Sequence, residues 1–143
     1  MDMHPVAEFH SYDAIPPIVI AVLYVLASSL LKEPGRRNFN AIMIGGAGGA
    51  YLSGGGLGVW EFLFTAVVTF CAYQGLHSYR FIGVGWLLHT GWDILHYFYG
   101  NPIVPFAPLS SAGCAITDAL IAIWFFADAP SVFGSFRKVR VRV

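Results

Sequence analysis

The sequence predicts an all-α fold, a polytopic bundle of five transmembrane helices. The chain of 143 residues is 57% hydrophobic and 11% charged, whereas a soluble domain usually carries about 25% charged residues. The apolar residues form five runs, each long enough to cross roughly 30 Å of hydrocarbon as a helix. The basic residues follow the first, third and fifth runs, so a five-span drawing places all of them on one side of the membrane.

The five runs are expected to form a single transmembrane domain over residues 1–143. We place the spans at about 14–31, 39–56, 59–76, 81–99 and 111–127. The first begins with Pro16 and Pro17, which the first turn of a helix tolerates because its N–H groups lack helical partners. The polar segment 32–38 ends that run and separates it from the second.

The second run is dense in glycine. Gly45 and Gly49 form a G-x-x-x-G pattern, which allows the backbones of two helices to approach closely. We therefore expect the protein to self-associate through this span. An alternative interpretation is a broken helix end at Gly54–Gly58, whose free amides would face an anion or a substrate.

The distribution of basic residues predicts the orientation. They follow the first, third and fifth spans, as Lys32, Arg36, Arg37, Arg80, Arg137, Lys138, Arg140 and Arg142. Because positively charged loops stay in the cytoplasm, we expect a multi-pass protein of the cell inner (plasma) membrane with its N-terminus outside and its C-terminus inside. The expected partners are the lipid bilayer and other copies or a larger membrane complex. The short basic tail has no recognition fold for nucleic acid.

The fourth span carries the most informative side chains. His89, Asp93 and His96 are spaced four and three residues apart, so they share one face of a helix. An ionisable group in hydrocarbon costs roughly 2.5–3.5 kcal/mol on insertion scales, and such groups usually face the interior of a bundle. Glu61 in the third span and Asp118 in the fifth lie at a similar depth. We therefore expect the five side chains to converge in the outer half of the membrane.

Two imidazoles and three carboxylates suit zinc, iron or manganese. In this interpretation His89, Asp93 and His96 are the metal ligands, while Glu61 or Asp118 is a further ligand or the general base. Such a site would act on a lipid-soluble or outer-face substrate. The same residues also suit a proton-coupled carrier of small solutes, because Asp, Glu and His relay protons in transporters. A third interpretation is packing between helices in a non-catalytic accessory subunit.

Three segments resemble a family of short bacterial and fungal integral membrane proteins described only as a domain of unknown function. They are Tyr51–Glu61, His89–His96 and Ser110–Asp118. The resemblance covers most of the chain beyond the first span. It implies a small polytopic protein and no particular activity.

Overall fold

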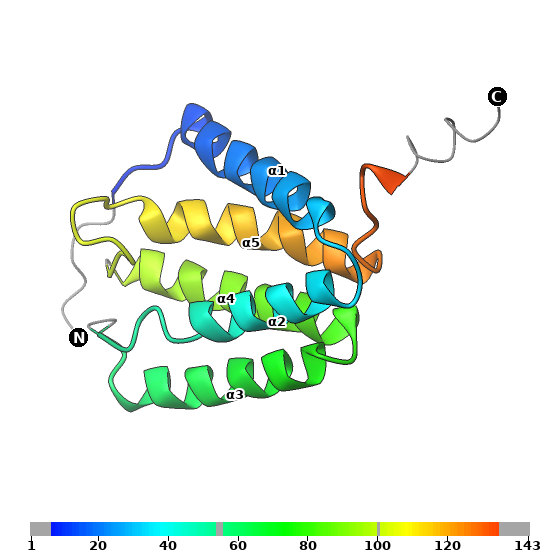
Figure 1. The fold of residues 1–143 in the computed structure, drawn as a ribbon. Coiled ribbons are helices and arrows are strands. Elements are labelled where there is room, and N and C mark those ends of the chain that lie inside the picture. Colours follow the sequence, from blue (N-terminus) through cyan, green and yellow to red (C-terminus); the bar gives the residue numbers. More distant parts are fainter. Residues whose placement is uncertain (1–6, 54–55, 100, 135–143) are drawn as a thin grey trace, which may run out of the picture.

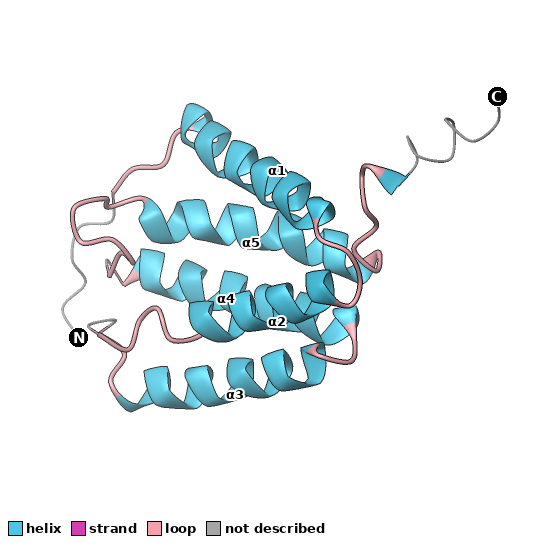
Figure 2. Ribbon diagram, in the orientation of Figure 1, coloured by secondary structure: helices cyan, strands magenta, loops and turns pink. Residues whose placement is uncertain are grey.

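The computed structural model describes residues 7–53, 56–99 and 101–134, and in these ranges the chain is helical with no strand. Its elements are the 3-10 helix η1 (Ser11–Ala14) and the α-helices α1 (Ile15–Leu30), α2 (Gly35–Ala47), α3 (Val59–Gly75), α4 (Tyr79–Phe98) and α5 (Ser110–Phe126). Consecutive helices run in opposite directions (Figure 1), and loops and turns connect them (Figure 2). The predicted all-α fold with five helices is therefore confirmed.

Four of the five helices begin and end within two residues of the predicted ranges, and α2 does not. It ends at Ala47 rather than at residue 56, and turns follow from Gly48 to Ser53. Each glycine in a helix interior costs about 1 kcal/mol relative to alanine, so the glycine-dense stretch ends the helix early. The predicted end of the second span was wrong for this reason.

By length and hydropathy, one helical stretch among the described residues could cross a membrane. It is Ser11–Leu30, with a mean hydropathy of 1.8. The helix α5 is apolar but shorter, and the 13 residues of α2 extend only about 20 Å. The ionisable residues of α4 lower its mean hydropathy. By this criterion the five-span arrangement is not confirmed.

The glycines of α2 allow close packing against α3 within the same chain. A Cβ atom on the residue after α2, Gly48, would lie 2.8 Å from Val68 Cγ1, and one on Gly45 would lie 3.3 Å from Ala72 Cβ. Both distances are shorter than ordinary contacts, so side chains at these positions would push the two helices apart. Self-association through this segment remains a prediction.

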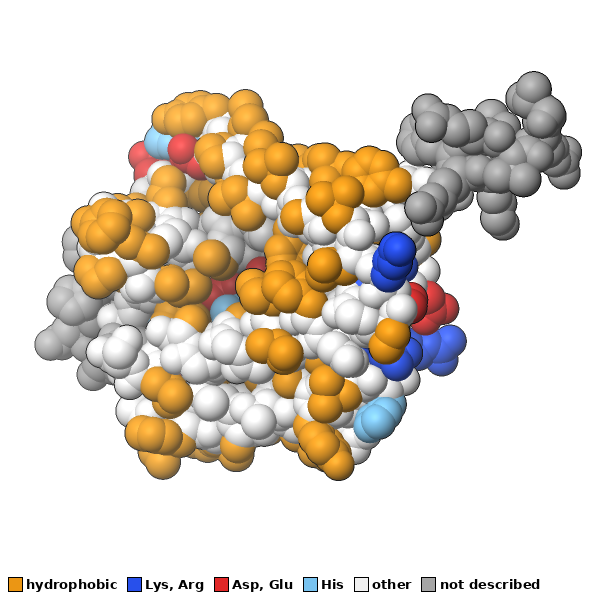
Figure 3. Space-filling view, in the orientation of Figure 1, with side chains coloured by type: hydrophobic (Ala, Val, Ile, Leu, Met, Phe, Trp, Pro, Cys, Tyr) orange, Lys and Arg blue, Asp and Glu red, His pale blue; other side chains and the backbone are white. Residues whose placement is uncertain are grey.

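Basic residues gather at one end of the bundle, on the right in Figure 3. Arg36 Nη1 donates to Ala129 O at 3.1 Å, and Arg37 Nε donates to Leu76 O at 2.9 Å. Leu76 is the C-cap of α3, so Arg37 pairs with a carbonyl that the helix end leaves free, and Arg36 binds the turn that follows α5. The four basic residues of the C-terminal tail lie outside the described residues: Arg137, Lys138, Arg140 and Arg142.

The surface and the interior reverse the usual distribution of polarity. The outward faces of α1 and α3 expose large apolar side chains, among them Ile15, Val22, Leu30, Val59, Phe62 and Phe70. The buried set contains many polar residues, among them Asn40, Glu61, His89, Asp93, His96 and Asp118. An apolar cluster that includes Ile44, Val68, Ile82 and Phe125 fills the core. Hydrophobic side chains cover much of the face shown in Figure 3.

Candidate metal centre

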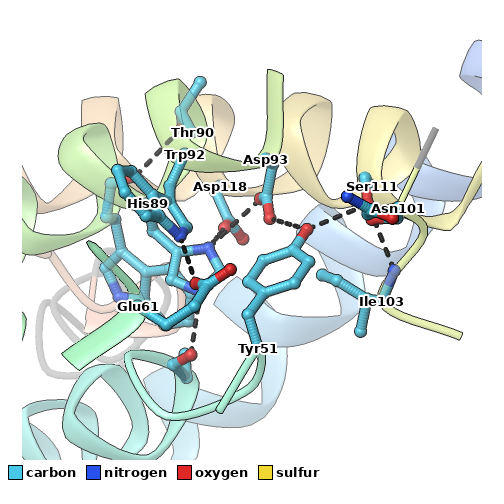
Figure 4. Close-up of polar contacts among 12 residues, drawn as sticks. Tyr51, Glu61, His89, Thr90, Trp92, Asp93, Asn101, Ile103, Ser111 and Asp118 are labelled. Carbon is cyan, nitrogen blue, oxygen red and sulfur yellow. Dashed lines mark hydrogen bonds and ion pairs between the residues drawn. The ribbon is translucent and has the colours of Figure 1, made fainter. Parts of the chain in front are cut away.

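Three buried side chains from α4 and α5 meet in the interior (Figure 4). His89 Nδ1 lies 3.1 Å from Asp93 Oδ2 and 2.8 Å from Asp118 Oδ2. His89 and Asp93 are one helical turn apart on α4, which places them on the same face. The exposed fractions are 3% for His89, 0% for Asp93 and 5% for Asp118. We call these three residues the triad.

The second ring nitrogen of His89 is also engaged. Nε2 lies 2.8 Å from the carbonyl oxygen of Ala47, the last residue of α2. Because a carbonyl oxygen only accepts hydrogen bonds, Nε2 must carry a proton and donate it. In the neutral imidazole, Nδ1 then presents its lone pair to the two carboxylates. Either a proton or a cation must therefore lie between Nδ1 and these oxygens.

One proton does not satisfy the whole triad. A proton on Nδ1 has good hydrogen-bond geometry toward Asp93 Oδ2. Asp118 Oδ2 is buried and lies 2.8 Å from the same nitrogen, but outside hydrogen-bond geometry, and it has no other hydrogen-bond partner among the described residues. Buried polar atoms are normally paired because desolvation without a partner is costly. A cation bound to all three atoms would satisfy both carboxylates.

Tyr51, from the turn after α2, holds Asp93 in place. Its hydroxyl lies 2.7 Å from Asp93 Oδ1 and 2.9 Å from Ser111 Oγ. Ser111 Oγ accepts a hydrogen bond from Ile103 N at 3.1 Å. The chain of hydrogen bonds therefore runs from the triad to the loop before α5, as Figure 4 shows.

Glu61 and His96 form a second buried pair beside the triad. His96 Nε2 lies 3.0 Å from Glu61 Oε1, and Trp92 Nε1 donates to Glu61 Oε2 at 2.9 Å. The backbone N–H of Leu57 also points to Glu61 Oε1, at 3.3 Å. The Tyr51 ring stacks on the His96 ring with 3.6 Å between centroids, so Tyr51 contacts both groups.

The structure thus brings all five predicted site residues together, but in two groups. Of the predicted metal ligands His89, Asp93 and His96, the first two lie in the triad and His96 pairs with Glu61. Of the predicted catalytic residues, Asp118 completes the triad and Glu61 does not. The alternative that free amides at Gly54–Gly58 face a substrate falls partly outside the described residues, and within this range the Leu57 amide faces Glu61.

A family model matches residues 12–131. The chain belongs to DUF6010, a family of unknown function. No curated protein and no solved structure matches the chain. The predicted membership of a family without assigned activity is therefore confirmed. The match carries no evidence about a membrane.

The triad has the donor set of a metal site. One atom from each residue, an imidazole nitrogen or a carboxylate oxygen, lies within 4.8 Å of the other two. Histidine ligands usually donate their other ring N–H to a carbonyl or carboxylate, and ligand carboxylates are themselves hydrogen-bonded. The Ala47 carbonyl and the Tyr51 hydroxyl supply these supporting contacts. The buried group could therefore bind a metal ion.

Tyr51 and Ala47 are the contributors that sequence reasoning missed. A backbone carbonyl carries no sequence signal. Tyr51 lies in a segment that was predicted to be helical, and it is in a turn in the structure. The sequence therefore did not predict that its side chain would face the fourth helix. The early end of α2 at Ala47 brings both groups to the triad.

Proposed function

We propose that the protein is an integral membrane protein that binds a divalent transition metal in its outer half and uses it in catalysis on a lipid-soluble or outer-face substrate. Zinc, iron and manganese suit a shell of one imidazole and two carboxylates. The observation that carries this proposal is the His89 environment. Its Nε2 proton is committed to Ala47 O, while Nδ1 faces two carboxylate oxygens.

The distribution of polarity supports the membrane part of the proposal. Large exposed apolar surfaces on a monomer usually contact a partner or a membrane. The short helix α2 and the turn after it pack against α3 and α4, and irregular backbone at membrane depth is tolerated when protein buries it. Lys32, Arg36, Arg37 and Arg80 share one end of the bundle, which supports a cytoplasmic location for that end.

Glu61 and His96 are suited to proton transfer beside the metal. A metal-bound water loses a proton more readily than bulk water and becomes a nucleophile. The buried pair offers a carboxylate and an imidazole within 3.0 Å of each other, with Tyr51 between the pair and the triad. In this assignment Glu61 is the general base, and Asp118 is a ligand.

A proton-coupled carrier is the second candidate, and the hydrogen-bond chain favours it. The part of this chain that could pass protons runs from the triad through Tyr51 to Ser111. Such chains of ionisable and hydroxyl groups relay protons in transporters. A pH-sensitive dye inside vesicles that contain the protein distinguishes this candidate, because only a carrier moves protons when a solute gradient is applied.

Metal content is the direct test of the first candidate. Protein purified in detergent and incubated with Zn²⁺ or Mn²⁺ should retain about one ion per chain after dialysis, measured by mass spectrometry of the elements. His89→Asn and Asp118→Asn should each lower this content at least about tenfold. The matched controls are His77→Asn and Asp128→Asn, which change exposed residues and should retain the ion. A metal-free wild-type protein, or equal losses in the controls, would contradict the proposal.

Two further variants separate the triad from the neighbouring pair. Glu61→Gln and His96→Asn should leave the metal content unchanged, because neither residue belongs to the triad. Loss of the ion in His96→Asn would instead support the ligand set His89, Asp93 and His96.

A further inference from the structure

An apolar cavity of about 510 Å³ lies between the first half of α1 and the start of α5. Pro16, Pro17 and Ile20 of α1 line one wall. Gly113 and Cys114 of α5 line the opposite wall, and 107–110 cover the outer end. Its volume is within the range of about 300–1,000 Å³ that small-ligand pockets occupy.

The cavity reaches to within one helical turn of the candidate metal centre. Cys114 lines it and precedes Asp118 by one turn of α5, so both residues face the same side of the helix. On the face shown in Figure 3, a hollow lies below α1, with acidic and histidine atoms visible at its floor.

The walls of the cavity favour an uncharged ligand. Among the described residues, no lysine or arginine lines it, and the one charged residue of this lining is Asp13 at the outer end. The Thr117 hydroxyl donates a hydrogen bond to Pro17 O at 3.0 Å, and the Ser110 hydroxyl accepts one from Val104 N at 3.0 Å. A phosphate or carboxylate headgroup would therefore find no cationic partner in the described part of the lining and would lie near carboxylates of like charge.

Space for a ligand is present at Gly113. No heavy atom lies within 4 Å of the position that a Cβ atom would take there. A larger side chain at this position would enter the cavity without displacing the backbone.

We propose that this cavity holds the apolar chain of an uncharged, single-chain lipid-like molecule, such as a long-chain ester, with its oxygen-containing group directed past Cys114 toward Asp118. The inference rests on the proposed function, since it names the substrate class of that site. A cavity of about 510 Å³ between two helices has room for one such chain, and the polar end of the ligand would then meet the metal centre.

Photocrosslinking tests the inference. The probe is a methyl palmitate that carries a diazirine on its chain, added to the full-length protein in nanodiscs. Crosslinks identified by mass spectrometry should concentrate in residues 13–20 and 107–117. Gly113→Leu should lower crosslinking at these segments about tenfold by filling the cavity. The matched control is Gly91→Leu, which adds the same side chain at an open, exposed helical position of α4 and should leave the crosslinks unchanged.

Cysteine alkylation gives a second measurement that needs no change in the cavity. In Cys71→Ala, Cys114 is the remaining cysteine, and methyl palmitate should slow its alkylation by N-ethylmaleimide, whereas palmitate anion should not. Crosslinks spread evenly over the lipid-facing surface, with no difference between Gly113→Leu and Gly91→Leu, would overturn the inference. So would alkylation that methyl palmitate leaves unchanged.

The two proposals can fail separately. The same crosslinking on His89→Asn measures ligand binding without the triad, and the elemental analysis measures the metal without the ligand. Localised crosslinks in a protein that binds no metal would support the cavity and contradict the metal centre. Metal binding with unlocalised crosslinks would contradict the cavity alone.

Discussion

Tyr51→Phe removes a single hydroxyl from the site and leaves the rest of the side chain in place. In the wild-type protein this hydroxyl lies 2.7 Å from Asp93 Oδ1. The Tyr51 ring is 4% exposed and stacks on His96, and phenylalanine preserves that stacking. The variant therefore isolates the contribution of one hydrogen bond to a proposed metal ligand.

The expected magnitude follows from two independent estimates. A hydrogen bond to a charged group contributes about 1.5–3 kcal/mol. Loss of a residue that hydrogen-bonds to a metal ligand typically weakens metal affinity about 10–100-fold, which equals about 1.4–2.7 kcal/mol at 25 °C. The two ranges overlap, so we expect the dissociation constant for Zn²⁺ or Mn²⁺ to rise at least about tenfold in Tyr51→Phe.

Isothermal titration calorimetry of the detergent-purified protein measures this change, and circular dichroism checks that the helices remain. Tyr73→Phe is the matched control, since Tyr73 lies on α3 and is 63% exposed. Its dissociation constant should equal that of the wild type. Equal metal affinity in Tyr51→Phe and the wild type would refute the argument that Tyr51 positions Asp93 for the ion.

Three further predictions concern packing, buried polarity and proton release. Gly48→Ala should destabilise the protein by about 1–3 kcal/mol in thermal unfolding because the new methyl group would overlap Val68, whereas Gly46→Ala, which meets open space, should not destabilise it. Asn40→Ala should cost about 1–3 kcal/mol because the hydroxyls of the half-buried Tyr24 and the buried Ser28 would lose their acceptor. Asn38→Ala changes an exposed residue of the same helix and should cost much less. Metal binding should weaken as the pH falls and should release protons, because the ligands bind in their deprotonated forms. Calorimetry in buffers of different ionisation enthalpy measures the number of protons released. A value of zero at every pH would contradict this prediction.

The helical part of the site could be predicted because it depends on a local rule. Residues 89, 93 and 96 share one face on any α-helix, and all three are buried on α4. Asp118 and Glu61 were expected at the same depth, and both lie in the buried cluster. Helix spacing and position along a span were sufficient to predict which residues are buried at the site.

The grouping of these residues could not be predicted because it depends on how the helices are rotated about their axes. The rotation of α3 places Glu61 against His96, while α5 places Asp118 against His89. The contribution of Tyr51 depends in turn on where α2 ends. Both are properties of the packed bundle, and neither has a signature in residue spacing.

X-ray absorption spectroscopy of the protein loaded with Zn²⁺ tests the central claim most directly, because it observes the atoms bound to the metal. The triad predicts nitrogen and oxygen neighbours at about 2.0–2.2 Å, with one imidazole and carboxylate oxygens in the shell. A shell with sulfur at about 2.3 Å, or the spectrum of hydrated zinc in solution, would contradict the assignment of His89, Asp93 and Asp118 as a metal centre.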